Sequence, residues 1–141
     1  LRYFNVYGPR QDPKSEYSAV IPIFISRILE GLPPVIYGDG NQTRDFTFVK
    51  DVVKANILAG KGDAEGVFNI ACGRRISLNE LAGLIMEITG LQVEPVYDRP
   101  RTGDIKDSLA DITAAGEALG YHPDYDMNQG LKETVKWFQK I

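Results

Sequence analysis

The stretch VIYGDGNQTRDFTFV, residues 35–49, sets the fold class of this chain. It begins with an apolar β-branched run, turns at Gly38 and Gly40, and returns to a second extended segment over residues 45–49. From Val49 onward, apolar residues recur at helical spacing until Gly60. Strand, turn, strand and helix in this order predict an α/β protein.

The segments on either side continue the alternation of strands and helices. The clearest helix start is a capping box of Ser77 and Glu80, and Gly90 ends that helix. The other expected elements are strands at residues 1–5, 66–72 and 93–97 and helices at residues 19–30, 111–119 and from 126 onward. Strands that alternate with helices pair in parallel and are normally buried on both faces. Since no earlier strand can pair with residues 1–5, we expect their neighbour in a part of the protein that precedes Leu1.

Composition and charge are those of an ordinary globular domain. The 141 residues are 43% hydrophobic and 25% charged, enough for one domain, or a large piece of one, with a real core. A net charge of −3 argues against nucleic acid and anionic membranes as partners, and no apolar run reaches membrane-spanning length. The single Cys72 excludes an internal disulfide and fits a reducing compartment, so we expect a cytoplasmic protein. Because the chain starts at Leu1 without a leader, we expect it to be cut from a longer protein.

Two loops carry charged side chains suited to an anionic ligand. Arg44 follows the glycine turn, where its guanidinium could bind phosphate oxygens; the alternative is an ion pair with Asp45 or Asp51. Arg101 and Asp104 lie three residues apart in a second loop. They could grip a phosphate and a ribose, or they could simply bond each other.

An amide and an aromatic ring complete the candidate set. Asn5 ends the first strand, and ligands of open α/β sheets bind beyond the carboxyl ends of strands. Its amide could bind a ligand oxygen, or it could form an Asx turn at the Tyr7-Gly8 bend. Tyr37 offers a ring for a flat base, with packing at the core or rim as the alternative. Together with the arginines, these residues predict a site for a diphosphate, a ribose and a base.

A catalytic set does not accompany these binding residues. No tyrosine has a lysine four residues later; the nearest match is Phe46 with Lys50, and phenylalanine has no proton to transfer. No G-x-G-x-x-G motif follows a strand. His122, the only histidine, has no nucleophile or carboxylate motif to pair with, so we expect it in a surface loop. We therefore predict no catalytic and no metal-binding residue in this chain.

The motifs together resemble those of the NAD-dependent epimerases and dehydratases, the extended short-chain dehydrogenases. The similarity runs in order through almost the whole chain and is closest to the UDP-hexose 4-epimerases. The segments that carry it are residues 1–11, 20–22, 37–46, 51–52, 68–70 and 101–104. The resemblance implies that residues 1–141 form the C-terminal, sugar-nucleotide-binding region of such an enzyme, including the last strand or strands of its nucleotide-binding sheet. The N-terminal Rossmann half, which holds NAD and the catalytic tyrosine and lysine, would then be absent.

The same resemblance implies a role for each matching position. Asn5 would contact the phosphate and sugar, and Ala19 and Val20 would line the nucleotide pocket. Val35, Ile36 and Tyr37 would flank the uracil. Arg44 would bind the diphosphate, and Arg101 with Asp104 would hold phosphate and ribose. Phe4, or its backbone, would touch the nicotinamide end of NAD.

These implications make the parent protein a homodimeric UDP-sugar 4-epimerase that oxidises sugar C4 transiently with NAD, while this chain alone is inactive. Phe46 after the Arg-Asp pair favours an epimerase over a 4,6-dehydratase, in which tryptophan is typical at that place. The alternatives are a dehydratase or decarboxylase acting on a nucleotide sugar, and a non-catalytic nucleotide-binding module. In isolation, the chain is expected to expose an apolar patch at residues 1–4 and around Ile23 and Phe24.

Overall fold

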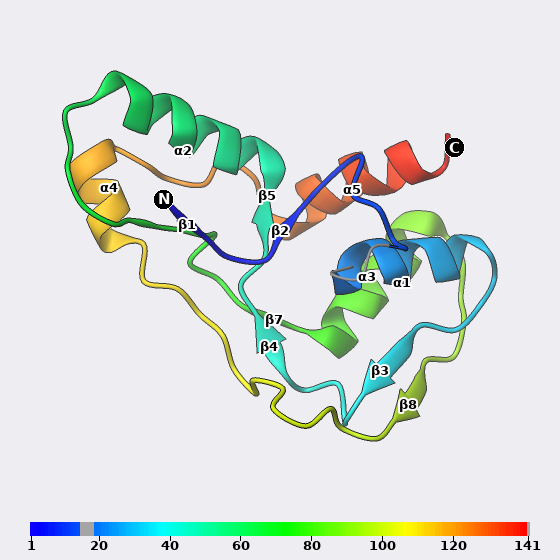
Figure 1. Cartoon of the computed structure of the whole chain (residues 1–141). Helices are drawn as coiled ribbons and strands as arrows, with labels where there is room; N and C mark the ends of the chain where they lie inside the picture. Colours follow the sequence, from blue (N-terminus) through cyan, green and yellow to red (C-terminus); the bar gives the residue numbers. More distant parts are fainter. Residues whose placement is uncertain (15–18, 141) are drawn as a thin grey trace.

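The computed structural model describes residues 1–14 and 19–140, and this part of the chain is an α/β protein, as predicted (Figure 1). Its helices are α1 (Val20–Leu29), α2 (Val49–Lys61), α3 (Leu78–Thr89), α4 (Thr113–Leu119) and α5 (Met127–Phe138). Its strands are β1 (Arg2–Tyr3), β2 (Val6–Tyr7), β3 (Val35–Tyr37), β4 (Thr43–Arg44), β5 (Thr47–Phe48), β6 (Asn69–Ile70), β7 (Ile76–Ser77) and β8 (Val96–Asp98). Within these residues no helix is both long and apolar enough to pass through a lipid bilayer.

The strands pair two by two, and most of the pairs are parallel. β1 pairs with β6, β2 with β5 and β3 with β8, all in parallel, as the alternation of strands and helices predicted. β4 and β7 form an antiparallel pair that the sequence did not reveal. Each of these two strands has only two residues, too few for a period of alternation to be read.

The N-terminal segment is divided into two strands by a bend at Asn5. Its φ angle is +36°, in the left-handed region that asparagine tolerates better than most residues. β1 pairs with β6 along one of its two edges, with Arg2 opposite Asn69. The partner comes from later in the sequence, because residues 66–72 fold back beside the N-terminus; only residues 69–70 of that predicted strand are regular. The neighbour that we expected from a part of the protein preceding Leu1 would lie along the other edge and stays a prediction.

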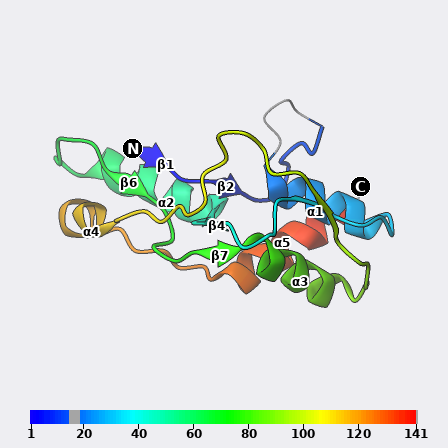
Figure 2. The same ribbon diagram turned by 90° about the horizontal axis from the view of Figure 1, so that it is seen from below.

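Two groups of buried side chains form the core (Figures 1 and 2). α1, α3 and α5 gather on one side of the molecule, and α2 and α4 lie on the other. The first core contains Phe24, Ile28, Ile85 and Leu131, which pack between α1, α3 and α5. The second core contains Ala55, Ile70 and Ala115, on the side of α2 and α4. Phe24 of α1 is only 1% exposed, so the expectation of an apolar patch around it is wrong: α3 and α5 of the same chain pack against α1 and cover it. Leu1 and Tyr3, by contrast, are 39% and 46% exposed.

Local capping signals fix the ends of the helices that carry this core. The Ser77 hydroxyl oxygen accepts a hydrogen bond from the Glu80 N–H, and the Ser77 N–H donates one to the Glu80 carboxylate, as the predicted capping box requires. Gly90 ends α3 with a φ angle of +71°, a conformation that glycine adopts without strain. A second capping box, of Asp126 and Gln129, starts α5.

Candidate functional site

A cavity of about 380 Å³ lies between α1, the β3–β4 segment and the loop after β8. Its lining contains eight of the nine residues that were expected to bind substrate: Asn5, Ala19, Val20, Val35, Tyr37, Arg44, Arg101 and Asp104. The remaining wall is formed by Ile23, Phe24, Arg27, Gln42, Phe46 and Leu78. The structure therefore brings together in one place side chains that are up to 99 positions apart, from Asn5 to Asp104.

The ninth residue, Ile36, lies between two of the others but faces the opposite way. Side chains of a strand alternate between its two faces, so Val35 and Tyr37 reach the cavity while Ile36 enters the first core and is 1% exposed. Only the main chain of Ile36 is left to meet a ligand. Phe4 does not line the cavity either; its carbonyl accepts a hydrogen bond of 2.6 Å from the Thr47 hydroxyl.

Arg44 forms an ion pair with Asp104 across the cavity wall. Its Nη1 also donates to the Thr43 carbonyl at 2.8 Å, and its side chain is 16% exposed. The alternative partners, Asp45 and Asp51, are turned elsewhere. A guanidinium and a carboxylate thus lie side by side at the place where the diphosphate and ribose were expected.

Asp45 is a buried structural acceptor. It is fully inaccessible, and its carboxylate accepts the N–H groups of Cys72 at 2.9 Å, Gly73 at 3.0 Å and Ala110 at 3.3 Å. Burial raises the pKa of this carboxyl, and the three hydrogen bonds act in the opposite direction. Asp45 therefore ties three segments together behind the residues that line the cavity.

Arg101 stacks on the ring of Tyr37. Its guanidinium carbon lies 3.9 Å from the ring centre, well within the range of a cation–π contact. Arg101 and Asp104 do not pair through their side chains; the Asp104 N–H donates to the Arg101 carbonyl at 3.2 Å, which closes a turn. The two charged groups of this loop thus contact residues of β3 and β4 instead of each other.

Asn5 uses its side chain as a brace. Its Nδ2 donates to the Asp45 carbonyl at 2.9 Å, and the Thr47 N–H donates to the Asn5 carbonyl at 3.3 Å. The Asx turn considered for this residue would have joined it to its immediate successors, and this long-range bond takes its place. The brace holds the bend between β1 and β2 against the chain that carries Arg44.

Gln42 is a wall residue that sequence reasoning missed. It is 8% exposed, and its Nε2 donates to the Tyr37 carbonyl at 2.6 Å. A glutamine in a glycine-rich turn gives no sign that it will be buried, because its burial depends on α3 packing over the turn. Arg27, also missed, donates from Nε to the Pro33 carbonyl at 2.7 Å and so belongs to the end of α1.

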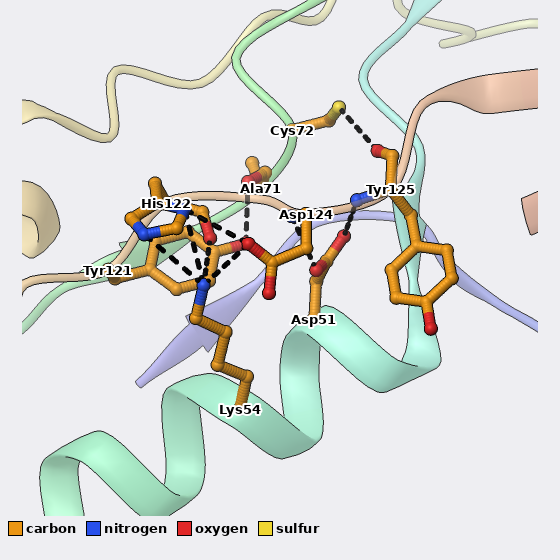
Figure 3. Close-up of polar contacts among 8 residues, drawn as sticks. All are labelled: Asp51, Lys54, Ala71, Cys72, Tyr121, His122, Asp124 and Tyr125. Carbon is orange, nitrogen blue, oxygen red and sulfur yellow. Dashed lines mark hydrogen bonds and ion pairs between the residues drawn. The ribbon is translucent and has the colours of Figure 1, made fainter. Parts of the chain in front are cut away.

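A second polar cluster lies on α2, outside this cavity (Figure 3). Lys54 Nζ contacts Asp124 Oδ1 at 2.7 Å and the His122 carbonyl at 3.0 Å, and Asp51 accepts the N–H groups of Asp124 and Tyr125. The His122 side chain is 72% exposed, in a surface position as predicted. Burial raises the pKa of Asp51, whereas Lys54 lowers the pKa of Asp124. These contacts fasten residues 121–125 to α2, which is a structural role.

A larger cavity, of about 610 Å³, holds none of the residues expected to bind a ligand. Tyr7, Cys72, Arg74 and Tyr125 are among its walls. Burial raises the pKa of the Cys72 thiol, which keeps it protonated and unreactive. The larger cavity also contains arginines, carboxylates and aromatic rings, so this chemistry alone does not separate the two. The smaller cavity is the better candidate because eight of the nine residues expected to bind substrate line it.

The α/β fold and the charged cavity describe a class of protein, and comparison with known proteins identifies the family. The model of the NAD dependent epimerase/dehydratase family matches residues 1–71. The chain belongs to this family.

Individual relatives are similar over almost all of the chain. It is 49% identical to the UDP-glucose 4-epimerase of Thermotoga maritima, solved with UDP-glucose, with a TM-score of 0.95 over 99% of this chain and 45% of that one. It is 50% identical to the UDP-N-acetylglucosamine 4-epimerase of Methanobrevibacter ruminantium M1, solved with UDP-N-acetylmuramic acid, again with a TM-score of 0.95 and the same coverage. A curated relative, the UDP-glucose 4-epimerase of Mycolicibacterium smegmatis, is 43% identical over 96% of this chain and 43% of its own length. The chain thus spans less than half the length of the relatives it matches.

Proposed function

We propose that this chain is the UDP-sugar-binding part of an NAD-dependent UDP-sugar 4-epimerase. The single observation that carries the proposal is the 380 Å³ cavity, in which Tyr37 of β3, Arg44 of β4 and the loop residues Arg101 and Asp104 line one space. Two guanidinium groups fit the two phosphates of a nucleotide sugar, and charge-assisted hydrogen bonds to them are about twice as strong as neutral ones.

The remaining walls suit the other parts of such a ligand. Val35 and Tyr37 present an apolar edge and a ring to a uracil, and Asp104 offers a carboxylate to the ribose hydroxyls. Ala19 and Val20 start α1 at the rim, where small and apolar side chains leave room for the base. We further propose that Asn5, a cavity residue at the bend after β1, contacts the sugar and phosphate, and that Phe4 or its backbone touches the nicotinamide end of NAD.

Catalysis would come from the part of the enzyme that this chain does not include. NAD bound there would accept a hydride from sugar C4 and return it, and these 141 residues contain no tyrosine followed four residues later by lysine. The chain's own groups bind and orient the substrate. We further propose that the parent enzyme is a cytoplasmic homodimer and that this chain alone is inactive.

Calorimetric titration of UDP-glucose into the full-length protein tests the proposal. Replacing Arg44 by alanine removes a cation whose side chain is 16% exposed, so binding should weaken by about 2 kcal/mol, or roughly 30-fold. Arg74→Ala is the matched control, because Arg74 lines only the larger cavity and contacts the Cys72 sulfur at 3.5 Å. Equal affinities for the wild type and Arg44→Ala would reject the assignment, and a loss confined to Arg74→Ala would move the site to the larger cavity.

A second function, dehydration or decarboxylation of a nucleotide sugar, is supported by other relatives. A UDP-N-acetyl-alpha-D-glucosaminuronate decarboxylase of Bacillus cytotoxicus is 38% identical to this chain, and a dTDP-glucose 4,6-dehydratase of Actinoplanes is also 38% identical. Product analysis of the full-length protein separates the reactions when UDP-glucose and a nucleotide sugar with a C6 carboxylate are offered in parallel. Release of CO2 from the second substrate indicates a decarboxylase, because UDP-glucose has no carboxylate to lose. UDP-galactose indicates an epimerase, and a 4-keto-6-deoxy sugar indicates a dehydratase.

A further inference from the structure

The loop between β8 and residue 106 is anchored at both ends by hydrogen bonds of the main chain. At one end β8 pairs with β3, and the Gly38 N–H donates to the Asp98 carbonyl at 2.9 Å. At the other end the Thr43 N–H donates to the Lys106 carbonyl at 2.8 Å, and the Thr43 hydroxyl donates to Asp107 at 2.6 Å. Residues 99–105, hereafter the 99–105 loop, are exposed throughout (Figures 1 and 2).

Two side-chain contacts hold the 99–105 loop to the wall of the candidate cavity. Asp104 pairs with Arg44 of β4, and Arg101 lies on the Tyr37 ring of β3. Each contact joins a side chain of the loop to one of the body, and all four were expected to meet a ligand. In the structure described here, the groups that would bind a nucleotide therefore bind one another.

The loop has open space on both of its sides. The candidate cavity of about 380 Å³ is on one side, and a hollow of about 540 Å³ between the loop and the turn after β3 is on the other. Tyr37, Gln42, Arg101 and Asp104 line both spaces. Gly103, with a φ angle of +82°, gives the loop a bend that other residues adopt with strain. The loop is thus held by contacts that can be exchanged, with no packed core beneath it.

We propose that the 99–105 loop is a latched flap that a nucleotide diphosphate opens by exchanging its contacts. The inference rests on the proposed function and adds a conformational step to the same site. A diphosphate carries more than one negative charge and several acceptor oxygens, so it replaces the single Asp104 carboxylate as the partner of Arg44 and attracts Arg101 off the Tyr37 ring. The exchange releases Asp104 for the ribose and uncovers the Tyr37 ring for the base. Uridine, which has no phosphate, leaves both contacts in place.

Arginine side-chain NMR of the full-length protein, labelled with ¹⁵N-arginine, tests the flap. In the free protein we expect the ring current of Tyr37 to displace the Arg101 side-chain signals. These signals should return to ordinary positions in Tyr37→Leu. Arg101→Lys, which lacks these signals, identifies which signals belong to Arg101. Saturating UDP removes this displacement and shifts the Arg44 signals, whereas uridine at the same concentration does neither. Since the UDP titration uses the wild type, the result holds even if Tyr37→Leu folds poorly.

Calorimetry on the same samples separates the flap from the proposed function. If UDP binds with measurable heat while the Arg101 displacement persists, the flap is overturned and the binding function stands. An Arg101 signal without displacement in the free protein also overturns the flap alone. If UDP does not bind, both proposals fail together.

Discussion

Replacing Asp45 tests the idea that a buried carboxylate holds the candidate site in place. Cys72 N–H donates to Oδ1, while the N–H groups of Gly73 and Ala110 donate to Oδ2, all in a fully inaccessible place. A hydrogen bond to a charged group contributes about 1.5–3 kcal/mol net. Asp45→Ala leaves three donors unpaired, so we expect the free energy of unfolding to fall by about 4–5 kcal/mol at the low end of that range.

The isosteric variant gives a graded result. Asp45→Asn can keep its carbonyl at the Oδ2 position and two of the bonds, but its NH2 group then faces the Cys72 N–H, so a loss of about 2 kcal/mol is expected. Urea unfolding of the 141-residue chain, followed by fluorescence of its only tryptophan, Trp137, measures both values. Asp63→Ala, at an exposed turn position, is the control and should change stability by less than about 0.5 kcal/mol. If Asp45→Ala falls within about 1 kcal/mol of this control, the three N–H groups do not depend on the carboxylate and the reasoning is wrong.

Three further outcomes follow from the packing. Gly130→Ala in α5 places a Cβ 2.1 Å from the Tyr7 hydroxyl oxygen, so the melting temperature should drop by an amount equivalent to about 1–3 kcal/mol. In the control Gly83→Ala, in α3, the added Cβ meets nothing within 4 Å, so this substitution should be neutral or stabilising. Ser77→Ala removes the cap of α3 and should cost about 1 kcal/mol at pH 7. Hydrogen bonds from Ser77 lower the pKa of Glu80 below its ordinary 4.5. The stabilisation by these bonds is therefore present above pH 4.5 and is lost as the pH falls through the lowered pKa. Urea unfolding should accordingly show a smaller stability difference between wild type and Ser77→Ala at pH 3 than at pH 7. Val53 and Ile57, on α2, are 52% and 51% exposed, and replacing both by lysine should reduce binding of a hydrophobic dye to the isolated chain; an unchanged dye signal would place the apolar surface elsewhere.

Local signals in the sequence gave the positions of the helices well. The capping box at Ser77, the closing Gly90 and the glycine turn before Arg44 each act within a few residues, so their effect could be read without knowing the rest of the fold. β6 and β8 were placed only approximately, because two or three residues of strand are defined by their partner rather than by their own pattern. The pairing of β1 with β6 was missed for the same reason, since it joins residues about 67 positions apart.

The partners of individual charged groups could not be predicted from the sequence. Asp45 and Asp51 are close neighbours of Arg44 along the chain and were natural candidates for its ion pair, yet Asp104, 60 positions away, is its partner. Both near carboxylates instead accept backbone N–H groups from distant loops. Which acceptor a buried donor finds depends on how loops return to the core, and no local pattern encodes that return.

The internal partners of the site residues also determine how much a ligand can gain from them. Arg44 already pairs with Asp104, Arg101 already lies on Tyr37, and the Asn5 amide already donates to the Asp45 carbonyl. A diphosphate bound at the proposed site would therefore replace existing interactions rather than fill unused ones, and only the difference between the two sets would appear as affinity. This is why about 2 kcal/mol, rather than the full strength of an arginine–phosphate contact, is expected for Arg44→Ala. The proposed ligand-binding groups are thus also the groups that hold the 99–105 loop in place.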